Sequence, residues 1–533
     1  MKLNLSELKN KASWQSRGYV LPDFDIEKIR KNTLESPIWL HFGAGNIFRA
    51  FPAALQQTLL DEGFSDKGII VCESYDEEII EKVYAPYDNL SIVVTLKPNG
   101  SIDKKIVSSI VHAMNIKGNL EELEKIFVSP TLQMVSFTIT EKGYSISDAN
   151  GNYYPDIQQD MHSNYENPKT LMGIVSYLCY KRYLAGRYPI ALVSLDNCSH
   201  NGSKLYNAIK TFAEIWVKYG FADKGYIDYI SNPKLVAFPW TMIDKITPRP
   251  SEKVKDILIE DGLEDVDIIK TTKNTYVSAF VNAEETQYLV IEDAFPNSRP
   301  PLEKAGVIFT DRQTVDKVEK MKVGTCLNPL HTILAIYGCL LGYTSISEEM
   351  KDKNLKTFIE KTAYEEGLPV VVDPGIIKPE DFIEEVINRR FPNPFVPDTP
   401  QRIACDTSQK IPVRFGETLK AYIASGKRDI STLKYIPLVF AGWLRYLMGI
   451  DDEGNPFTPS SDPMLEKLQT YLKNISLGDK GPFTDALKPI LSDSSIFGVN
   501  LYEYNLASKV EGMFAELVAA KKAVRHTLEK YLS

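Results

Sequence analysis

Residues 37–64, PIWLHFGAGNIFRAFPAALQQTLLDEGF, set the architecture of the first half of this chain. The segment begins as an apolar strand, turns tightly at Gly43 and Gly45, and continues with the period of a helix. In such a unit the first glycine permits the turn, and the second lets the backbone approach a pyrophosphate. Phe48 replaces the usual third glycine, so a structural glycine turn is an equal alternative for this segment alone.

Strand and helix patterns alternate through the rest of the first 300 residues. GIIVCESYD (68–76) predicts a second buried strand, and Asn99-Gly100 predicts the turn of a hairpin. Residues 132–144 and 188–202 are apolar strands that end in polar turns, with a helix pattern at 171–186 between them. This alternation indicates an α/β domain with a largely parallel sheet.

The pattern changes near residue 300, after the proline-rich segment RPPLEKAG. Most of the following sequence has helical period, most clearly at 353–367, 379–391, 435–449, 464–476 and 507–533. We therefore expect a mainly α-helical second half.

The charge and the cysteines exclude several classes of protein. A net charge of −9 argues against nucleic acid as the main partner, because phosphate binding needs a basic surface. The six cysteines include no CxxC pair, which argues against a zinc ribbon or a disulfide scaffold and favours a reducing cytosol. No apolar signal segment is seen at the start of the sequence, and the apolar runs are too short to cross a bilayer, so we expect a cytoplasmic protein.

An acidic residue ends the second predicted strand. Glu73 would accept hydrogen bonds from the adenosine ribose of a dinucleotide and would repel a 2′-phosphate, which favours NAD over NADP. Asp76 is a competing candidate, and an ordinary strand-end acid is an equal alternative for Glu73.

The segment KVGTCLNPLH (322–331) gathers a base, an amide and an imidazole before an apolar helix pattern. Asn328 suits the N-cap of that helix and Pro329 its first position. Lys322, Asn328 and His331 would then cluster where a helix N-terminus brings partial positive charge. This combination suits alcohol–ketone chemistry on a polar substrate.

Six motifs occur in a fixed order: HFGAGNIFRAF, FTITEKGY, SLDNCSHNG, FPWTMIDKITP, QYLVIEDAFPNSRPPLEKAGVIFTD and KVGTCLNPLH. From about residue 38 to 445 the chain resembles the long-chain, zinc-independent polyol dehydrogenases, the family of mannitol 2-dehydrogenase and fructuronate reductase (mannonate oxidoreductase). Residues 1–35 have a short helix pattern and are interpreted as an N-terminal arm. The resemblance implies a Rossmann-type NAD-binding domain, here 36–300, and a mainly helical substrate and catalytic domain, here 301–533. It also implies an active site between the two domains.

The resemblance assigns catalytic roles residue by residue. The family's catalytic lysine corresponds to Lys322, and its two oxyanion-binding asparagines correspond to Asn197 and Asn328. Its histidine corresponds to His331, and Glu319 matches a glutamate linked to proton exchange with solvent. Taken by themselves, Asn328 could simply cap its helix, His331 could be a structural histidine, and Asn197 could be a turn residue.

Substrate and cofactor contacts are implied in the same way. Asp244 matches a substrate-site aspartate, and Arg402 and Lys410 match a basic pair that contacts the substrate. These three could equally be ordinary surface charges. The expected cofactor residues are Gly43, Gly45, Asn46, Phe48, Arg49 and Glu73.

One spacing departs from the family. The lysine and asparagine are usually five residues apart, whereas Lys322 and Asn328 are six apart. Either the segment bulges by one residue or Lys322 is displaced, and Lys320 is the only other lysine close by. We retain Lys322 as the candidate.

The residue types explain how an alcohol could be oxidised. A lysine base at neutral pH needs burial and nearby positive charge, because lysine's ordinary pKa is about 10.4. Asn197 and Asn328 would donate N–H groups to the developing alkoxide, each typically worth about 3–4 kcal/mol in the transition state. His41 and His200 have no second ligand at zinc spacing, so we expect no metal.

The leading hypothesis is NAD-dependent interconversion of D-mannonate and D-fructuronate, with Arg402 and Lys410 available for the substrate carboxylate. The same pair could hold hydroxyls of mannitol, so a mannitol 2-dehydrogenase is the main alternative. A non-catalytic sensor of sugar acids and an isomerase with tightly held NAD are minority alternatives. A monomer and a homodimer both remain open.

Overall fold

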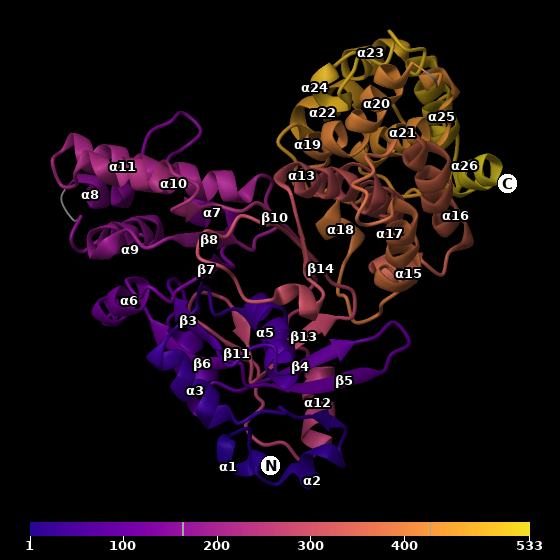
Figure 1. Ribbon diagram of the computed structural model, residues 1–533. Helices are drawn as coiled ribbons and strands as arrows, with labels where there is room; N and C mark the ends of the chain where they lie inside the picture. Colours follow the sequence, from indigo (N-terminus) through magenta and orange to yellow (C-terminus); the bar gives the residue numbers. More distant parts are fainter. Residues whose placement is uncertain (163–164, 427) are drawn as a thin grey trace. The chain divides into compact units, whose positions relative to one another are not determined.

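The computed structural model describes residues 1–162, 165–426 and 428–533. The chain divides into two compact units, one of residues 1–97 and 101–316, the other of residues 317–533 with the turn at 98–100. The first unit is built on parallel strands and the second on helices (Figure 1). The predicted α/β fold with a mainly helical second half is confirmed.

A six-stranded parallel sheet forms the centre of the first unit. Its strand order is β6-β3-β2-β7-β8-β9, and every neighbouring pair is parallel. The strands are β2 (Trp39–Phe42), β3 (Ile69–Glu73), β6 (Ile110–Asn115), β7 (Met134–Phe137), β8 (Ile190–Ser194) and β9 (Val236–Ala237). This is the order of a doubly wound dinucleotide-binding sheet, in which the direction of strand addition reverses between β2 and β7.

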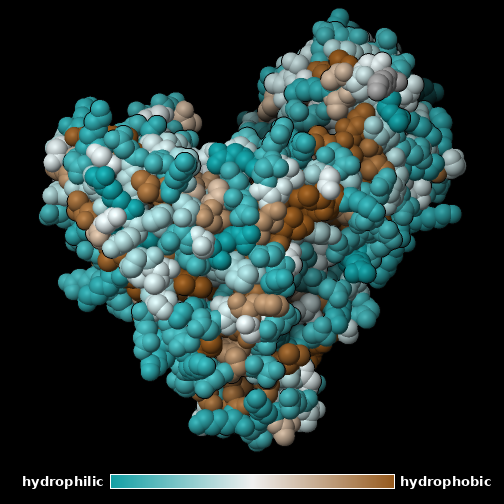
Figure 2. All heavy atoms as spheres, viewed as in Figure 1, coloured by the Kyte–Doolittle hydropathy of each residue, from teal (hydrophilic) through white to brown (hydrophobic). Residues whose placement is uncertain are grey.

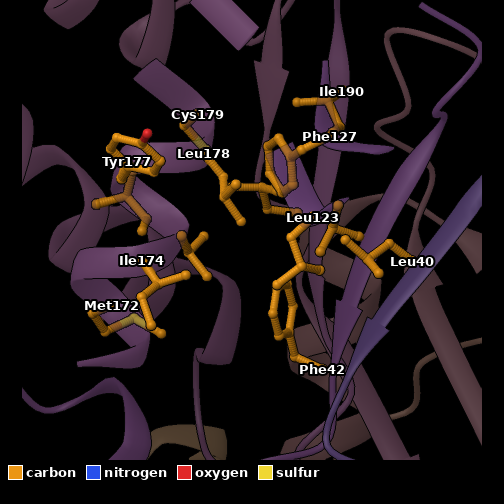
Figure 3. Packing of buried hydrophobic residues seen from close by; sticks show 14 of the residues in the cluster. Leu40, Phe42, Leu123, Phe127, Met172, Ile174, Tyr177, Leu178, Cys179 and Ile190 are labelled. Atoms are coloured by element: carbon orange, nitrogen blue, oxygen red, sulfur yellow. The ribbon is translucent and has the colours of Figure 1, made fainter. Parts of the chain in front are cut away.

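Alternating side chains of the central strands fill a core on each face of this sheet. Leu40 and Phe42 pack with α6 (Leu120–Phe127), α9 (Leu171–Gly186) and α10 (Asn201–Lys218), and Figure 3 shows part of this core. Trp39 packs on the opposite face with α5 (Pro52–Asp61). The alternation follows from the two-residue period of a strand, and both faces are covered, as is usual for a parallel sheet.

Smaller sheets complete the first unit. The predicted hairpin around Asn99-Gly100 is confirmed, since β4 (Ser91–Leu96) and β5 (Ile102–Val107) pair antiparallel. β4 also pairs with β13 (Phe280–Glu284), and β14 (Tyr288–Glu292) lies between β10 (Thr241–Asp244) and β15 (Ile308–Thr310). β11 (Ile269–Lys270) and β12 (Tyr276–Val277) form a short pair. Because β15 joins β14, the first unit extends to Asp316, beyond the expected boundary at 300.

The first 35 residues pack into the first unit. They form α1 (Leu5–Leu8), α2 (Lys11–Gln15), β1 (Tyr19–Val20) and α3 (Ile26–Glu35), and β1 pairs with β5. Trp14 is fully buried, and Lys104 lies over the Tyr19 ring while donating to Asp261. The remaining helices of the unit are α4 (Asn46–Ala50), α7 (Glu141–Tyr144), α8 (Pro155–His162), α11 (Lys224–Ser231) and α12 (Glu252–Glu260).

Helices build the second unit. The longer ones are α13 (Arg312–Met321), which starts in the first unit, α14 (Asn328–Leu340), α16 (Lys353–Lys361), α17 (Pro379–Glu385), α20 (Glu417–Ser425), α21 (Tyr435–Leu447), α22 (Leu465–Leu472), α23 (Thr484–Leu491), α25 (Ala507–Val518) and α26 (Ala523–Leu532). Shorter ones are α15 (Ile346–Glu349), α18 (Pro400–Ile403), α19 (Thr407–Ile411) and α24 (Ser494–Phe497). Four π-helical turns interrupt them: η4 (Lys322–Cys326), η5 (Thr362–Gly367), η7 (Val386–Arg390) and η8 (Pro412–Gly416).

One apolar helix is longer than the sequence suggested. α13, η4 and α14 form a continuous helical stretch, Arg312–Leu340. Judged by length and composition only, this stretch is long and apolar enough to cross a bilayer. However, 78% of its apolar window is buried inside the protein, as in the core helix of a soluble protein. Polar residues cover most of the face shown in Figure 2, with hydrophobic residues exposed in smaller groups.

Candidate active site

Gly43 lies where the central strand β2 ends, beside β7. Its φ is +105°, and a Cβ added there would lie 2.4 Å from the carbonyl oxygen of Thr138, so only glycine fits. The Thr138 hydroxyl donates to the Gly43 carbonyl oxygen at 3.2 Å. Gly45, just before α4, has open space where a Cβ would stand. The reversal point of the sheet thus has the tight turn and open backbone that suit a pyrophosphate.

Two side chains expected at the cofactor hold this loop from inside. The Phe48 ring is fully buried and stacks on His41, with 4.1 Å between ring centroids. Arg49 is also fully buried and donates to the Ser278 carbonyl oxygen (2.8 Å) and to Asn46 Oδ1 (2.9 Å). With no exposed surface, Phe48 and Arg49 shape the loop rather than contact a ligand. This corrects the expected contact role of both residues.

The Glu73 carboxylate is bound by backbone N–H groups. It is 5% exposed, and its Oε2 accepts the N–H of Ala44 at 2.7 Å, which ties the glycine loop to the end of β3. Its Oε1 accepts three further N–H groups, those of Ser74, Tyr75 and Asp76. The competing acid, Asp76, is 3% exposed and accepts the Thr271 hydroxyl at 2.6 Å. In this structure Glu73 holds the cofactor loop, whereas the sequence suggested contact with a ribose.

Lys322 is buried, with 4% exposure, at the start of the π-helical turn η4. Lys320, the alternative, is exposed. The Leu327 N–H donates to the Lys322 carbonyl oxygen at 3.1 Å, five residues back. A π turn holds one residue more than an α turn, so it absorbs the extra residue before Asn328 as a bulge. Glu319, on the preceding turn of α13, is half-buried.

Asn328 does not cap a helix, contrary to our expectation. Because the helix continues from η4 into α14, Asn328 has no free helix N-terminus beside it, and the local positive charge predicted there is lost. Pro329 lacks an N–H, and the Thr418 hydroxyl instead donates to the carbonyl oxygen of Gly324 (3.2 Å). Among the described residues, the Asn328 side-chain amide makes no hydrogen bond, so its N–H groups are available to a ligand.

His331 lies one turn after Asn328 on α14. Its Nε2 is 3.6 Å from Asp398 Oδ2, and its ring lies 5.1 Å from that of Phe391. Burial lowers the pKa of His331 to about 4, and Asp398 opposes this shift only in part. The imidazole is therefore neutral at physiological pH, and a neutral ring can donate one hydrogen bond and accept another.

The expected basic pair is engaged within the second unit. Arg402 pairs with Asp398, and its side chain is 63% exposed. Lys410 donates to the carbonyl oxygens of Ile403 (3.1 Å) and Cys405 at the end of α18. Burial lowers the pKa of Lys410, and the neighbouring Arg414 acts in the same direction.

Asn197 lies on the exposed loop that follows β8, in the first unit. The neighbouring Asp196 accepts a hydrogen bond from the buried Tyr144, whose hydroxyl also lies 2.7 Å from Ser194 Oγ. Burial raises the pKa of Asp196 to about 7, against the effect of these hydrogen bonds. The Tyr144–Asp196 contact anchors this loop, and nothing in the sequence pattern pointed to it.

Asn201 joins this loop to strand β10. It is fully buried, and its Nδ2 donates to the Asp196 carbonyl oxygen (3.0 Å) and to Thr241 Oγ1 (2.9 Å). Its Oδ1 accepts the Thr241 N–H at 3.1 Å. Asp244 ends the same strand and is 5% exposed. One buried amide thus fixes the loop of Asn197 and the strand of Asp244 together.

Comparison with known protein families identifies the family of this chain. Residues 37–304 match the mannitol dehydrogenase Rossmann domain, and residues 314–517 match the mannitol dehydrogenase C-terminal domain. The chain belongs to the mannitol dehydrogenase family. The family resemblance seen in the sequence is confirmed, and this member is an oxidoreductase acting on CH–OH groups.

Relatives of known function cover the chain from end to end. D-mannonate oxidoreductase of Thermotoga maritima is 54% identical over 99% of both chains. Mannitol 2-dehydrogenase of Neosartorya fischeri is 28% identical over 100% of this chain and 99% of its own.

Solved structures of two dehydrogenases also match the chain. A D-sorbitol dehydrogenase in substrate-free form matches with a TM-score of 0.82 and 26% identity, covering 98% of this chain and 100% of its own. The Pseudomonas fluorescens mannitol 2-dehydrogenase ternary complex with NAD and D-mannitol matches with a TM-score of 0.70 and 27% identity, over 100% and 99% of the two chains.

The histidines considered for a metal have other partners in this family member. His41 lies 2.6 Å from Ser136 Oγ and 2.8 Å from Thr138 Oγ1. His200 lies 3.2 Å from Asp316 Oδ1 and stacks on Trp240. Within the part of the chain that the structure describes, three or more His, Cys, Asp or Glu side chains nowhere gather closely enough to hold a metal ion.

The candidate residues are distributed over both units of this mannitol dehydrogenase relative. The first holds the glycine loop, Asn197 and Asp244, and the second holds Lys322 and the residues around His331. Sequence reasoning missed Arg414 on η8, whose guanidinium donates to Thr332 Oγ1 at 2.6 Å beside Asn328. Its position just after the RIACDTSQK motif was the only available signal.

Proposed function

We propose that this protein is an NAD-dependent oxidoreductase that interconverts D-mannonate and D-fructuronate. The observation that carries the proposal is the end-to-end 54% identity with a D-mannonate oxidoreductase. The mannitol 2-dehydrogenases are about half as similar, at 28% identity. A sugar acid carries a carboxylate, which needs positively charged partners when it leaves water for a binding site. The second unit has basic residues around His331 that can serve as these partners.

The first unit fits NAD. Gly43 makes the required turn and Gly45 leaves the backbone open, at the reversal point of a sheet with the dinucleotide-binding strand order. The carboxylate of Glu73 beside this loop would repel a 2′-phosphate, which favours NAD over NADP. NAD, when bound, accepts or supplies the hydride, and the protein contributes placement and electrostatics.

The candidate catalytic residues divide the remaining work. Lys322 takes the hydroxyl proton during oxidation and returns one to the oxygen during reduction. Asn197 and Asn328 donate side-chain N–H groups to the oxygen as negative charge develops on it. The free amide of Asn328 supports this role.

His331 and Glu319 assist in different ways. Neutral His331 orients the substrate through a hydrogen bond, because a ring with a pKa of about 4 is a poor proton donor at neutral pH. Glu319, half-buried one turn before Lys322, exchanges the proton of the lysine with solvent. Asp244 completes the set as a substrate-binding carboxylate.

The hypothesis of a non-catalytic sensor is no longer supported by the spacing that suggested it. It rested on the extra residue between Lys322 and Asn328, and the π turn accommodates that residue. A mannitol 2-dehydrogenase remains the second candidate, since enzymes of that name are similar over the whole chain. We further propose that the protein is cytoplasmic and acts on a small-molecule substrate. We also propose that it is a monomer or a homodimer, and gel filtration with light scattering would test this oligomeric state.

The substrate assignment is tested with purified protein and NADH. We expect kcat/KM for D-fructuronate to exceed that for D-fructose by at least about 100-fold, the discrimination that a matched charge can give. D-tagaturonate distinguishes between sugar acids in the same assay. If D-fructose is reduced faster than D-fructuronate, the sugar-acid assignment is wrong.

The catalytic lysine is tested by paired substitutions. We expect Lys322→Ala to lower kcat by roughly 100- to 10,000-fold, because a general base is lost, while NADH binding stays near the wild-type level. Lys320→Ala is the matched control, since this exposed lysine lies one half-turn away. The reverse pattern would transfer the catalytic role to Lys320.

A further inference from the structure

Arg414 is held beside the helix that carries Asn328 and His331. It lies on the π turn η8, and its Nη1 donates to Thr332 Oγ1 (2.6 Å) and to the Asn328 carbonyl oxygen (3.4 Å). These two contacts fix the guanidinium against the first turn of α14. A molecule that reaches the Asn328 amide therefore lies within reach of Arg414.

Arg414 has no acidic partner among the described residues. Arg402 pairs with Asp398, and Arg525 pairs with Asp352. Burial alone lowers the pKa of Arg414 to about 10, with no carboxylate acting against it. A partly buried cation without a counter-ion is unfavourable, because it has lost water and gained no compensating charge.

The donors of Arg414 are also under-used. The buried Arg182 places its donors on five carbonyl oxygens, those of Phe127, Ser129, Leu132, Tyr188 and Pro189. Arg414 uses only Nη1, and its Nε and Nη2 make no hydrogen bond within the part of the chain that the structure describes. Neither nitrogen is among the fully buried polar atoms that lack a hydrogen-bond partner, so both have surface that a ligand can contact.

The neighbouring cations are less suited to binding an anion. Arg402 is mostly exposed and already paired with Asp398, and the ammonium of Lys410 is engaged by two carbonyl oxygens. Arg402 still contributes positive charge near His331, and Lys410 lies near Arg414 and Arg402. Unlike Arg402 and Lys410, Arg414 combines a fixed position, open donors and no acidic partner among the described residues.

We propose that Arg414 binds the carboxylate of the sugar-acid substrate and thereby selects sugar acids over neutral polyols. The inference rests on the proposed function. Nε and Nη2 form one edge of the planar guanidinium, and this edge can bind both oxygens of a carboxylate at once. A neutral polyol offers no negative charge to this edge and leaves the guanidinium without a counter-ion.

The test compares two substrates in Arg414→Gln. We expect kcat/KM for D-fructuronate to fall about 100-fold, while that for D-fructose changes by less than about threefold. Arg414→Lys keeps the charge without the planar edge, and we expect an intermediate loss. Arg389→Gln removes an exposed arginine of the same unit and should change neither substrate.

Product inhibition gives a second reading, which reports binding of the sugar acid and not the rate of the chemical step. In Arg414→Gln the inhibition constant of D-mannonate should rise about as much as kcat/KM falls, and that of D-mannitol should not change. Fluorescence of bound NADH checks that the first unit is intact in every variant.

The outcomes separate the inference from the proposed function. If the wild type prefers D-fructuronate but Arg414→Gln loses both substrates equally, Arg414 is only structural and the inference is overturned. If D-mannonate inhibition is unchanged in the variant, the carboxylate binds elsewhere and the inference is again overturned. If the wild type itself prefers D-fructose, the proposed function fails and the inference fails with it.

Discussion

At the scale of single residues, the surroundings of His331 decide its chemistry. Arg414, Arg402 and Arg390 all disfavour a positive charge on the ring, and burial disfavours it most. Asp398 acts in the opposite direction. The imidazole therefore stays neutral through the whole range in which the enzyme would work, and it can serve as a hydrogen-bond partner with a constant charge.

This neutral histidine makes stability depend on pH. The pKa of His331 is about 4 in the folded protein, below its ordinary value of 6.5, so the unfolded chain takes up a proton first as the pH falls. The stability contribution is fully present above pH 6.5 and is lost down to about pH 4, with a maximum of about 3 kcal/mol.

His331→Gln tests this by urea unfolding at several pH values. The wild type should lose more stability than the variant between pH 6.5 and 4, because glutamine does not titrate. Equal losses in the two proteins would mean that His331 is not held neutral.

Residue identities were easier to predict than residue partners. Gly43 was predictable, since a strand followed by a tight turn needs glycine there. The partners of Glu73 were not, because the decisive N–H of Ala44 comes from the loop after another strand, β2. Arg414 was invisible for the same reason: its significance lies in the absence of an acid, which only the folded chain reveals.

At the scale of elements, the π turn η4 accommodates the six-residue spacing between Lys322 and Asn328, where the family resemblance implies five. One extra residue in an α-helix would rotate every later side chain by about 100°. When the extra residue is confined to a π turn, the helix beyond it keeps its register. Asn328 and His331 then lie on an α-helix that follows directly from the turn that carries Lys322.

Deletion of Gly324 tests this account of the π turn. Gly324 has no side chain to lose, and its removal costs the hydrogen bond that its carbonyl oxygen accepts from the Thr418 hydroxyl. We expect an α-helical turn with the family spacing and a kcat within about tenfold of wild type. As a matched control, deletion of Ala335 in the regular, buried part of α14 should abolish activity. Loss of activity with the Gly324 deletion as well would show that the π turn itself is required.

Element types were largely predictable, and element ends were not. The periodicities of two and 3.6 residues indicated the strands and helices. Asn328-Pro329 has the sequence signature of a helix start, yet the helix is already present before it. Local signals identify caps correctly only when the preceding segment is not helical, and here the π turn η4 (Lys322–Cys326) precedes Asn328.

At the scale of the whole molecule, each unit has its own core and its own share of the candidate site. The first presents a glycine loop at the reversal point of a parallel sheet, and the second presents Lys322 on a buried helix. The α/β and helical halves could be predicted because their hydrophobic patterns differ. The extent of the first unit could not, because β15 is a three-residue strand with no pattern of its own.

The most direct measurement of the central claim is oxidation by the intact protein with NAD⁺, followed by absorbance of NADH. D-mannonate and D-mannitol differ at one end of the molecule, where a carboxylate replaces a hydroxymethyl group, so the pair isolates that charge. We expect kcat/KM for D-mannonate to exceed that for D-mannitol by at least about 100-fold, with D-fructuronate as the product. Oxidation of D-mannitol at an equal or greater kcat/KM would contradict the account.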